Sequence, residues 1–153
     1  MMLISIKGAV MNFRPSWEIF ALGSAFFAAL TAIFGKIGVA GINSNLATFI
    51  RTAVIMVMIA GVVSFHNAWQ KPASISTHSW LFLILSGIAT GLSWLCYYRA
   101  LQLGPVSKVA PIDKLSVAFA IILGLIFLGE NLSWPLAVGG LLIIAGSLVI
   151  IMF

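Results

Sequence analysis

The sequence predicts an all-α polytopic membrane protein, a transmembrane bundle of about five membrane-spanning helices. Five long apolar runs fill most of its 153 residues, and about 20 apolar residues in a helix cross a hydrocarbon layer about 30 Å thick. The runs are too long and too uniformly apolar for the strands of a membrane barrel. The composition agrees, since 62% of the residues are hydrophobic and 7% are charged, whereas soluble domains carry about 25% charged residues.

The chain begins with a weakly apolar lead over residues 1–15, and Met11 is a second candidate start. The lead has no small-residue cleavage site after a compact apolar core, so we expect no cleaved signal peptide. The membrane domain is predicted over residues 16–153. Its first helix is expected over residues 16–37, because Pro15 stands where helices often begin.

The second helix is predicted over residues 46–65, after a short polar connector. A polar break over residues 66–79 is the longest in the chain and is expected to be a surface loop. The third helix follows over residues 80–101. Tryptophans stand near the ends of the apolar runs, as an interfacial aromatic belt requires; they are Trp17, Trp69, Trp80 and Trp134.

The fourth helix is predicted over residues 106–128 and is interrupted at Pro111. A proline inside a helix removes one backbone hydrogen bond and clashes with the preceding turn. Unwound backbone at membrane depth is tolerated only where protein buries it or where it lines a watery cavity. The fifth helix, over residues 134–153, follows a five-residue connector.

Small residues recur on several helices at spacings that place them on one face. Such residues let two helix backbones approach closely in lipid. Those expected to pack helices are Gly87 and Gly91, then Ala120 and Gly124 in register with Ser116, and finally Gly139 and Gly146. The stripe of the fourth helix has a ligand groove as its alternative interpretation.

Four ionisable residues lie within or next to the apolar runs: Lys36, Arg51, Asp113 and Lys114. Each costs about 2.5–3.5 kcal/mol at the centre of a bilayer, so each needs a partner or a function. One hypothesis pairs Asp113 with Arg51 or Lys36. The other has the cations reaching the headgroups while Asp113 caps a helix.

The proline break and these charges together predict a cavity at membrane depth for a small solute. Trp94 and Tyr98 would add an aromatic wall suited to organic molecules. The predicted binding residues are Lys36, Arg51, Trp94, Tyr98, Pro111, Asp113, Lys114 and Ser116. The chain contains no catalytic motif and only three acidic residues, so we do not expect an enzyme.

The charges and the cysteine exclude other classes of partner. Basic residues are scattered singly and form no basic face for nucleic acid. Cys96 is the one cysteine and is expected to be a packing residue. His66 and His78 have no metal-binding residue beside them in the sequence. We therefore predict lipid as a partner, with no nucleic acid, metal or cofactor.

Several short segments resemble the EamA-type domain of the drug/metabolite transporter superfamily. These are Phe34–Lys36, Phe49–Thr52, Tyr98–Gly104, Val109–Ser116 and Phe127–Leu132. The resemblance covers nearly all of the chain after Met11. It implies a carrier or exporter of small metabolites or drugs that has no ATP-binding domain.

The resemblance implies that a typical member of that family contains two such five-helix units in tandem, inserted in opposite senses. This chain holds one such unit. One unit cannot enclose an alternating-access cavity, so the resemblance implies a homodimer, with an antiparallel arrangement as one option, or a second half-unit. An accessory subunit that transports nothing and a passive channel remain as alternatives.

The orientation in a bacterial-type inner membrane follows from the basic residues near the helix ends. With five spans the two termini lie on opposite faces. Three cations fall on each side of the bundle, so the positive-inside rule gives little preference, and insertion in both senses is expected. They are Lys7, Arg14 and Lys71 on one side and Lys36, Arg99 and Lys108 on the other.

Overall fold

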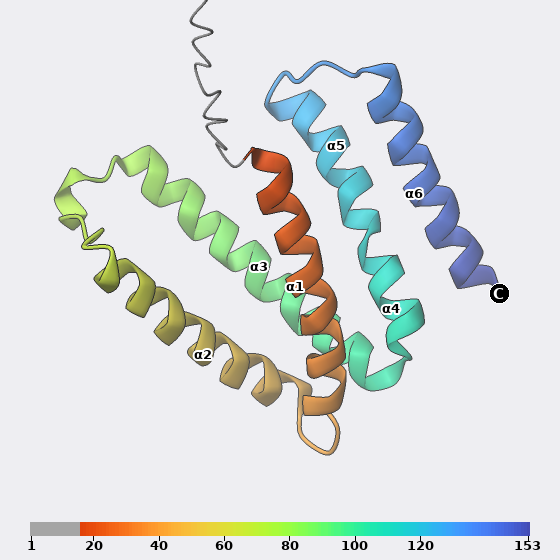
Figure 1. The fold of residues 1–153 in the computed structure, drawn as a ribbon, viewed down its shortest axis with the longest axis horizontal. Coiled ribbons are helices and arrows are strands. Elements are labelled where there is room, and N and C mark those ends of the chain that lie inside the picture. Colours follow the sequence, from red (N-terminus) through yellow and green to blue (C-terminus); the bar gives the residue numbers. More distant parts are fainter. Residues whose placement is uncertain (1–15) are drawn as a thin grey trace, which may run out of the picture. The chain divides into compact units, whose positions relative to one another are not determined.

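The computed structural model describes residues 16–153, and this part of the chain is helical without strands (Figure 1). The predicted lead over residues 1–15, with Met11 and Pro15, lies outside the described residues. In chain order the elements are α1 (Trp17–Gly38), α2 (Ser44–Phe65), the short 3-10 helix η1 (Pro72–Ser74), α3 (Thr77–Leu103), α4 (Val106–Asp113), α5 (Leu115–Phe127) and α6 (Trp134–Met152).

Five segments of this part of the chain are long and apolar enough to cross a membrane. They are α1, α2, α3, α6 and the combined stretch of α4 and α5 over Val106–Phe127. The predicted class of polytopic helical membrane protein is therefore confirmed. The contacts divide the chain into two compact units, one that ends at Thr31 and one that runs from Ala32 to Phe153. The second unit contains the end of α1 and all later helices.

Polar side chains begin three of the helices by capping their first turns. The side-chain oxygens of Asn43, Ser76 and Ser133 accept hydrogen bonds from backbone N–H groups of α2, α3 and α6, which have no partner inside the helix. The cap at Ser76 starts α3 at Thr77, before the predicted residue 80. Gly129 has φ +66° and turns the chain out of α5, a conformation that favours glycine.

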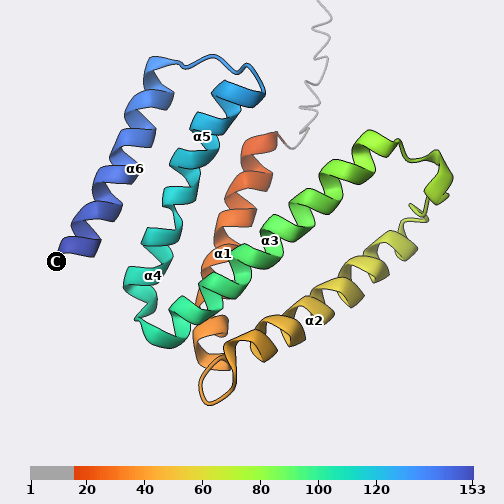
Figure 2. The ribbon, with the colours of Figure 1, turned by 180° about the vertical axis from the view of Figure 1, so that it is seen from behind.

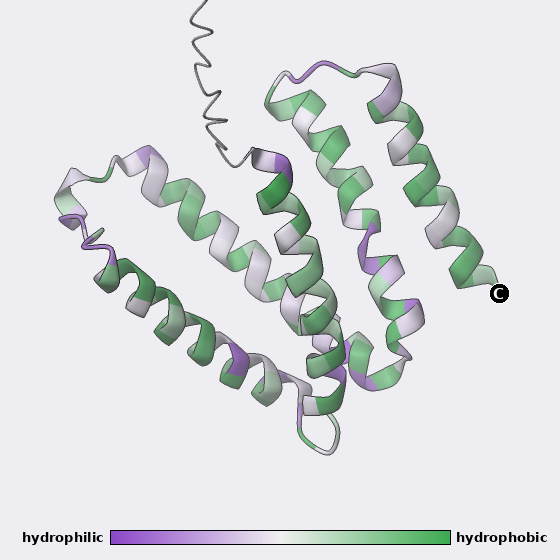
Figure 3. Ribbon diagram, in the orientation of Figure 1, coloured by the Kyte–Doolittle hydropathy of each residue, from purple (hydrophilic) through white to green (hydrophobic). Residues whose placement is uncertain are grey.

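The surface of the helices is apolar along most of their lengths. Figure 3 shows hydrophobic residues along each helix and hydrophilic residues at helix ends and where α4 meets α5. Large exposed side chains such as Phe49, Phe82 and Phe119 would aggregate in water. In a bilayer they meet lipid chains, which accounts for a fold with few buried apolar residues.

The buried core cluster of the second unit joins the turn after α1 to α2 and α3. It consists of Val39, Ala47, Tyr98 and Leu101. Gly35 makes this packing close, because a Cβ at that position would stand 3.2 Å from the Tyr98 hydroxyl oxygen and 3.3 Å from a methyl carbon of Leu101. The end of α1 thus rests on the end of α3.

Helix α6 contacts both α4 and α5, as Figure 2 shows from behind. Gly140 allows this approach, since a Cβ there would lie 3.2 Å from the Cδ1 atom of Ile121. Gly124 of α5 is also in close contact, with the Glu130 carboxylate, whose Oε2 atom lies 2.9 Å from the position of an added Cβ.

The other glycines expected to pack helices have no such neighbour in the described chain. A Cβ added to Gly87, Gly91, Gly139 or Gly146 would meet nothing within 4 Å. Within one copy of the chain, Gly140 rather than Gly139 packs against α5, because Gly140 is the residue that faces Ile121. Ser116 and Ala120 are exposed, and α5 instead buries Ala118 together with Gly124.

Candidate functional site

The predicted fourth helix is broken one turn after its proline, at Lys114, which separates α4 from α5. In a continuous helix the carbonyl of Pro111 would accept the N–H of Leu115. Here it accepts the N–H of Lys114 at 3.1 Å. It also accepts the Ser147 hydroxyl of α6 at 3.0 Å. Ser147 is 4% exposed, so a buried side chain of the neighbouring helix satisfies the backbone at the break.

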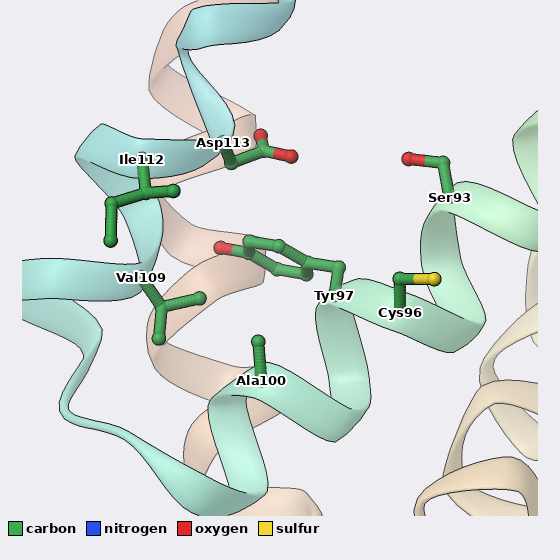
Figure 4. A pocket seen from close by; sticks show the side chains of 7 residues that line it. All are labelled: Ser93, Cys96, Tyr97, Ala100, Val109, Ile112 and Asp113. Carbon is green, nitrogen blue, oxygen red and sulfur yellow. The ribbon is translucent and has the colours of Figure 1, made fainter. Parts of the chain in front are cut away.

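An open pocket of about 270 Å³ lies beside this break, between α3 and α4. Figure 4 shows the Asp113 carboxylate and the Ser93 hydroxyl pointing toward one another, with the Tyr97 ring between the two helices. Most of the remaining surface is apolar. The seven lining residues are Ser93, Cys96, Tyr97, Ala100, Val109, Ile112 and Asp113.

Sequence reasoning named Asp113 but missed most of the other pocket residues. Ser93, Tyr97 and Ala100 are spaced by four and three residues along α3, so they share one face. That spacing was the available signal for Tyr97. Cys96 was expected to be a packing residue and instead lines the pocket, where it is exposed.

The charge of Asp113 is only weakly neutralised. Its Oδ2 atom lies 3.6 Å from the Lys114 Nζ atom, and the two side chains are 38% and 54% exposed. Exposed pairs of this kind contribute about 0–1 kcal/mol. Within residues 16–153, Asp113 pairs with neither Arg51 nor Lys36.

Arg51 instead packs on the aromatic wall that the sequence had assigned to the same cavity. Its guanidinium carbon lies 3.8 Å from the centre of the Trp94 ring and 5.5 Å from that of Tyr98. These rings face α2, whereas Tyr97 faces α4. The predicted cluster is therefore divided between two faces of α3.

Lys36 caps α3. Its Nζ atom donates hydrogen bonds to the backbone carbonyl oxygens of Leu101 and, at 2.8 Å, of Gly104. Carbonyls at the end of a helix have no N–H partner within that helix, so they are free to accept from Lys36. The negative end of the helix dipole also attracts the cation. Lys36 therefore does not face Asp113, and Ser116 does not line the pocket.

The described residues offer no metal site, since no three His, Cys, Asp or Glu side chains gather in residues 16–153. What the pocket offers is one carboxylate, two hydroxyls and an aromatic ring at membrane depth. Such groups can bind a solute through charge, hydrogen bonds and stacking.

Comparison with known proteins agrees with this architecture. The chain matches the EamA-like transporter family over residues 15–152. It is similar to an uncharacterized transporter in the cobO 3′ region of a Sinorhizobium species, with 54% identity over 138 residues that cover 90% of this chain and 98% of the relative. No solved structure matches. The family match spans all five membrane helices, and the chain thus belongs to the EamA-like transporter family of integral, multi-pass membrane proteins.

Proposed function

We propose that the protein is a secondary carrier of small organic solutes in a bacterial inner membrane, and that two five-helix units form one carrier. The observation that carries the proposal is the open pocket beside the break between α4 and α5. A carboxylate at membrane depth is costly and usually marks a solute or proton pathway. Broken helices near such groups are a recurring feature of secondary transporters.

The chemistry of the pocket favours organic solutes with both a polar and an apolar part. Asp113 and Ser93 supply polar groups on one side, while Val109, Ile112 and the ring of Tyr97 supply an apolar wall. Ligand pockets typically combine a mostly apolar lining with a few polar groups that fix orientation.

The size of the pocket supports pairing of two units. Its volume of about 270 Å³ is below the range of about 300–1,000 Å³ typical of small-molecule sites. It is also open on one side in the single unit. The Sinorhizobium relative is matched over 98% of its own length, so it is similar in length to this chain. We infer that a second copy, inserted in the opposite sense, completes the cavity.

Reconstituted transport tests the carrier hypothesis. The purified protein is placed in liposomes and screened for uptake of a panel of radiolabelled amino acids, nucleosides, organic acids and cationic drugs. We expect saturable uptake of at least one class and counterflow when the same solute is preloaded inside. Protein-free liposomes and liposomes with the Asp113→Asn variant are the controls.

The same screen separates the alternatives. Uptake that rises linearly with concentration and shows no counterflow would indicate a passive channel. Insertion of folded protein with no uptake of any solute would indicate an accessory subunit. Either result would reject the carrier hypothesis.

A further inference from the structure

Arg51 lies on the α2 side of α3 and does not line the Asp113 pocket. Arg51 lies on α2, and its guanidinium stacks on Trp94 and Tyr98. These rings are separated from Ser93 and Tyr97 by one position each, and successive helical residues point about 100° apart. Arg51 and Asp113 therefore serve different faces of the same helix.

The N–H groups at the edge of this guanidinium have no acceptor among the residues that the structure describes. Within residues 16–153, the Arg51 side chain takes part in neither a hydrogen bond nor an ion pair, and its guanidinium lies over the two rings. The nearby hydroxyls of Thr48 and Thr52 donate to carbonyls of their own helix. Arginine has five N–H donors in a planar fork, and stacking occupies the face of that plane while leaving its edge available.

The two ring distances place the Arg51 guanidinium nearer to the ring that lies farther from the end of α3. Helices α2 and α3 meet at one end, where the Gln102 amide donates to the Ile42 carbonyl at 2.8 Å. Counted along the helix from Leu103, the end of α3, Tyr98 lies about 7.5 Å and Trp94 about 13.5 Å from that end at about 1.5 Å per residue. The guanidinium is nearer to Trp94, the deeper ring, at 3.8 Å against 5.5 Å. A cation seeking headgroups would extend the other way.

We propose that Arg51, seated on Trp94 and Tyr98, binds the oxyanion of a transported organic solute. The group is a carboxylate, phosphonate or sulfonate carried on an apolar body. A guanidinium edge accepts such a group through two parallel N–H···O bonds. The rings hold the fork in place and provide an apolar surface for the rest of the solute. Naming the ligand as a transported solute rests on the proposed carrier function.

A lipid phosphate offers the same oxyanion chemistry, so the test must separate the two sources. Trp94 provides a local optical signal once the other four tryptophans are replaced by phenylalanine; they are Trp17, Trp69, Trp80 and Trp134. Emission of Trp94 is then followed during titration with benzoate, phenylphosphonate or benzenesulfonate. Benzyl alcohol and benzylamine serve as neutral and cationic counterparts. Each titration is run in phosphate-free maltoside micelles and in phosphatidylcholine nanodiscs.

We expect at least one anion to give a saturable change in both environments, with no saturable change from the alcohol or the amine. Removing a charged hydrogen-bond partner weakens binding by about tenfold or more, so Arg51→Gln should shift the titration by that factor. Arg51→Lys keeps the charge but loses the fork, and its shift should be smaller. Arg99→Gln removes an exposed arginine that bonds to the Gln102 side chain instead, and it should leave the titration unchanged.

Three results would overturn the proposal. Titration in micelles but not in nanodiscs would assign the site to lipid phosphate. If no anion gave a saturable change in either environment while the helix content stayed normal, there would be no anion site at Arg51. An equal response to anions and to benzyl alcohol would indicate plain hydrophobic binding. Because the measurement needs no transport, anion binding by a protein that moves no solute would reject the carrier function and leave the anion site standing.

Discussion

At the level of single residues, three charged side chains that the sequence grouped together have separate roles. Lys36 bonds to backbone carbonyls at the end of α3. Arg51 stacks on two aromatic rings. Asp113 faces an open pocket and is weakly paired with Lys114. Each cation finds its stabilisation without the carboxylate, and this leaves Asp113 available to a solute or a proton.

Replacing Asp113 by Asn should lower solute uptake while leaving membrane insertion intact. The amide keeps the shape of the carboxyl group and removes its charge. Charged hydrogen-bond partners contribute about 1.5–3 kcal/mol, so we expect uptake to fall by about tenfold or more. Initial rates in liposomes measure the effect, and Lys114→Gln is the matched control for the neighbouring exposed charge. If both variants took up solute at the rate of the parent protein, the charges of Asp113 and Lys114 would serve only membrane topology and helix packing.

Replacing Lys36 by Met should destabilise the fold. The change removes two hydrogen bonds to the carbonyls of Leu101 and Gly104 together with the favourable charge at the helix end. We expect a loss of about 1–3 kcal/mol, measured as a lower thermal midpoint in detergent. Lys108→Met, at an exposed position of α4, is the control. An unchanged midpoint together with lost transport would restore Lys36 to the solute site that the sequence suggested.

At the level of elements, close packing depends on a few contacts between helices, because lipid surrounds the rest of each helix. The end of α1 meets α3 through Gly35, and α6 meets α5 through Gly140. The break between α4 and α5 is held by the Ser147 hydroxyl of α6. In lipid, helix association relies on such close contacts and interhelical hydrogen bonds. Single substitutions at these points should therefore change the stability of the fold.

Replacing Ser147 by Ala should weaken the break between α4 and α5. The buried hydroxyl donates to the Pro111 carbonyl at 3.0 Å, and its loss leaves that acceptor with only the Lys114 N–H. We expect a destabilisation of about 1 kcal/mol, seen as faster hydrogen exchange of the N–H groups around Lys114. Ser116→Ala, on the exposed start of α5, is the matched control. If both variants exchange at the parent rate, the hydroxyl does not stabilise the break.

Replacing Gly35 by Ala should be destabilising even though alanine is the better helix former. The new methyl group would lie 3.2 Å from the Tyr98 hydroxyl and 3.3 Å from Leu101, two buried side chains with little room to move. Overpacking of this kind costs about 1–3 kcal/mol. Gly61→Ala is the control, since its methyl group would meet nothing within 4 Å and should gain up to about 1 kcal/mol of helix propensity. Chemical unfolding in mixed micelles compares the two, and a gain at both positions would contradict the packing of α1 on α3.

At the level of the whole molecule, the pocket beside Asp113 is open, and several glycines have no neighbour among the described residues of one chain. Gly87 and Gly91 of α3 and Gly139 and Gly146 of α6 have space around them. The expectation that they pack helices stays a prediction, now directed at a second copy of the chain. Pairing in opposite senses would reproduce the inverted repeat on which many transporters are built, and it requires that the unit insert both ways.

Adding positive charge to one end should bias the orientation and reduce transport. Gln70 and Ala73 lie in the exposed connector between α2 and α3, beside Lys71. A Gln70→Lys, Ala73→Lys double variant should hold that connector on the cytoplasmic side, deplete the oppositely inserted copy and lower uptake. The neutral Gln70→Asn, Ala73→Ser variant is the control. Cysteine accessibility on both faces reports the orientation, and a single orientation in the parent protein would contradict the antiparallel pair.

The sequence by itself determined the class of the protein, its five membrane spans and the presence of a broken helix with a carboxylate. Long apolar runs, a proline and an ionisable residue at depth are properties of the chain that hold whatever the helices touch. It also pointed to Asp113, which lines the pocket.

Only the tertiary structure decided which residues meet. Lipid rather than water covers the exposed face of helix α3, so polar residues do not mark a solvent side, and the spacing of Ser93 and Tyr97 was only a weak signal of which face meets α4. Trp94 and Tyr98 were expected beside Asp113, but Tyr97 lines the pocket and the other two rings meet Arg51. The role of Lys36 was equally hidden, because its partners are backbone carbonyls about 65 residues away that any amino acid could have provided. Helix faces that look alike in sequence are distinguished only by the contacts that the folded chain makes.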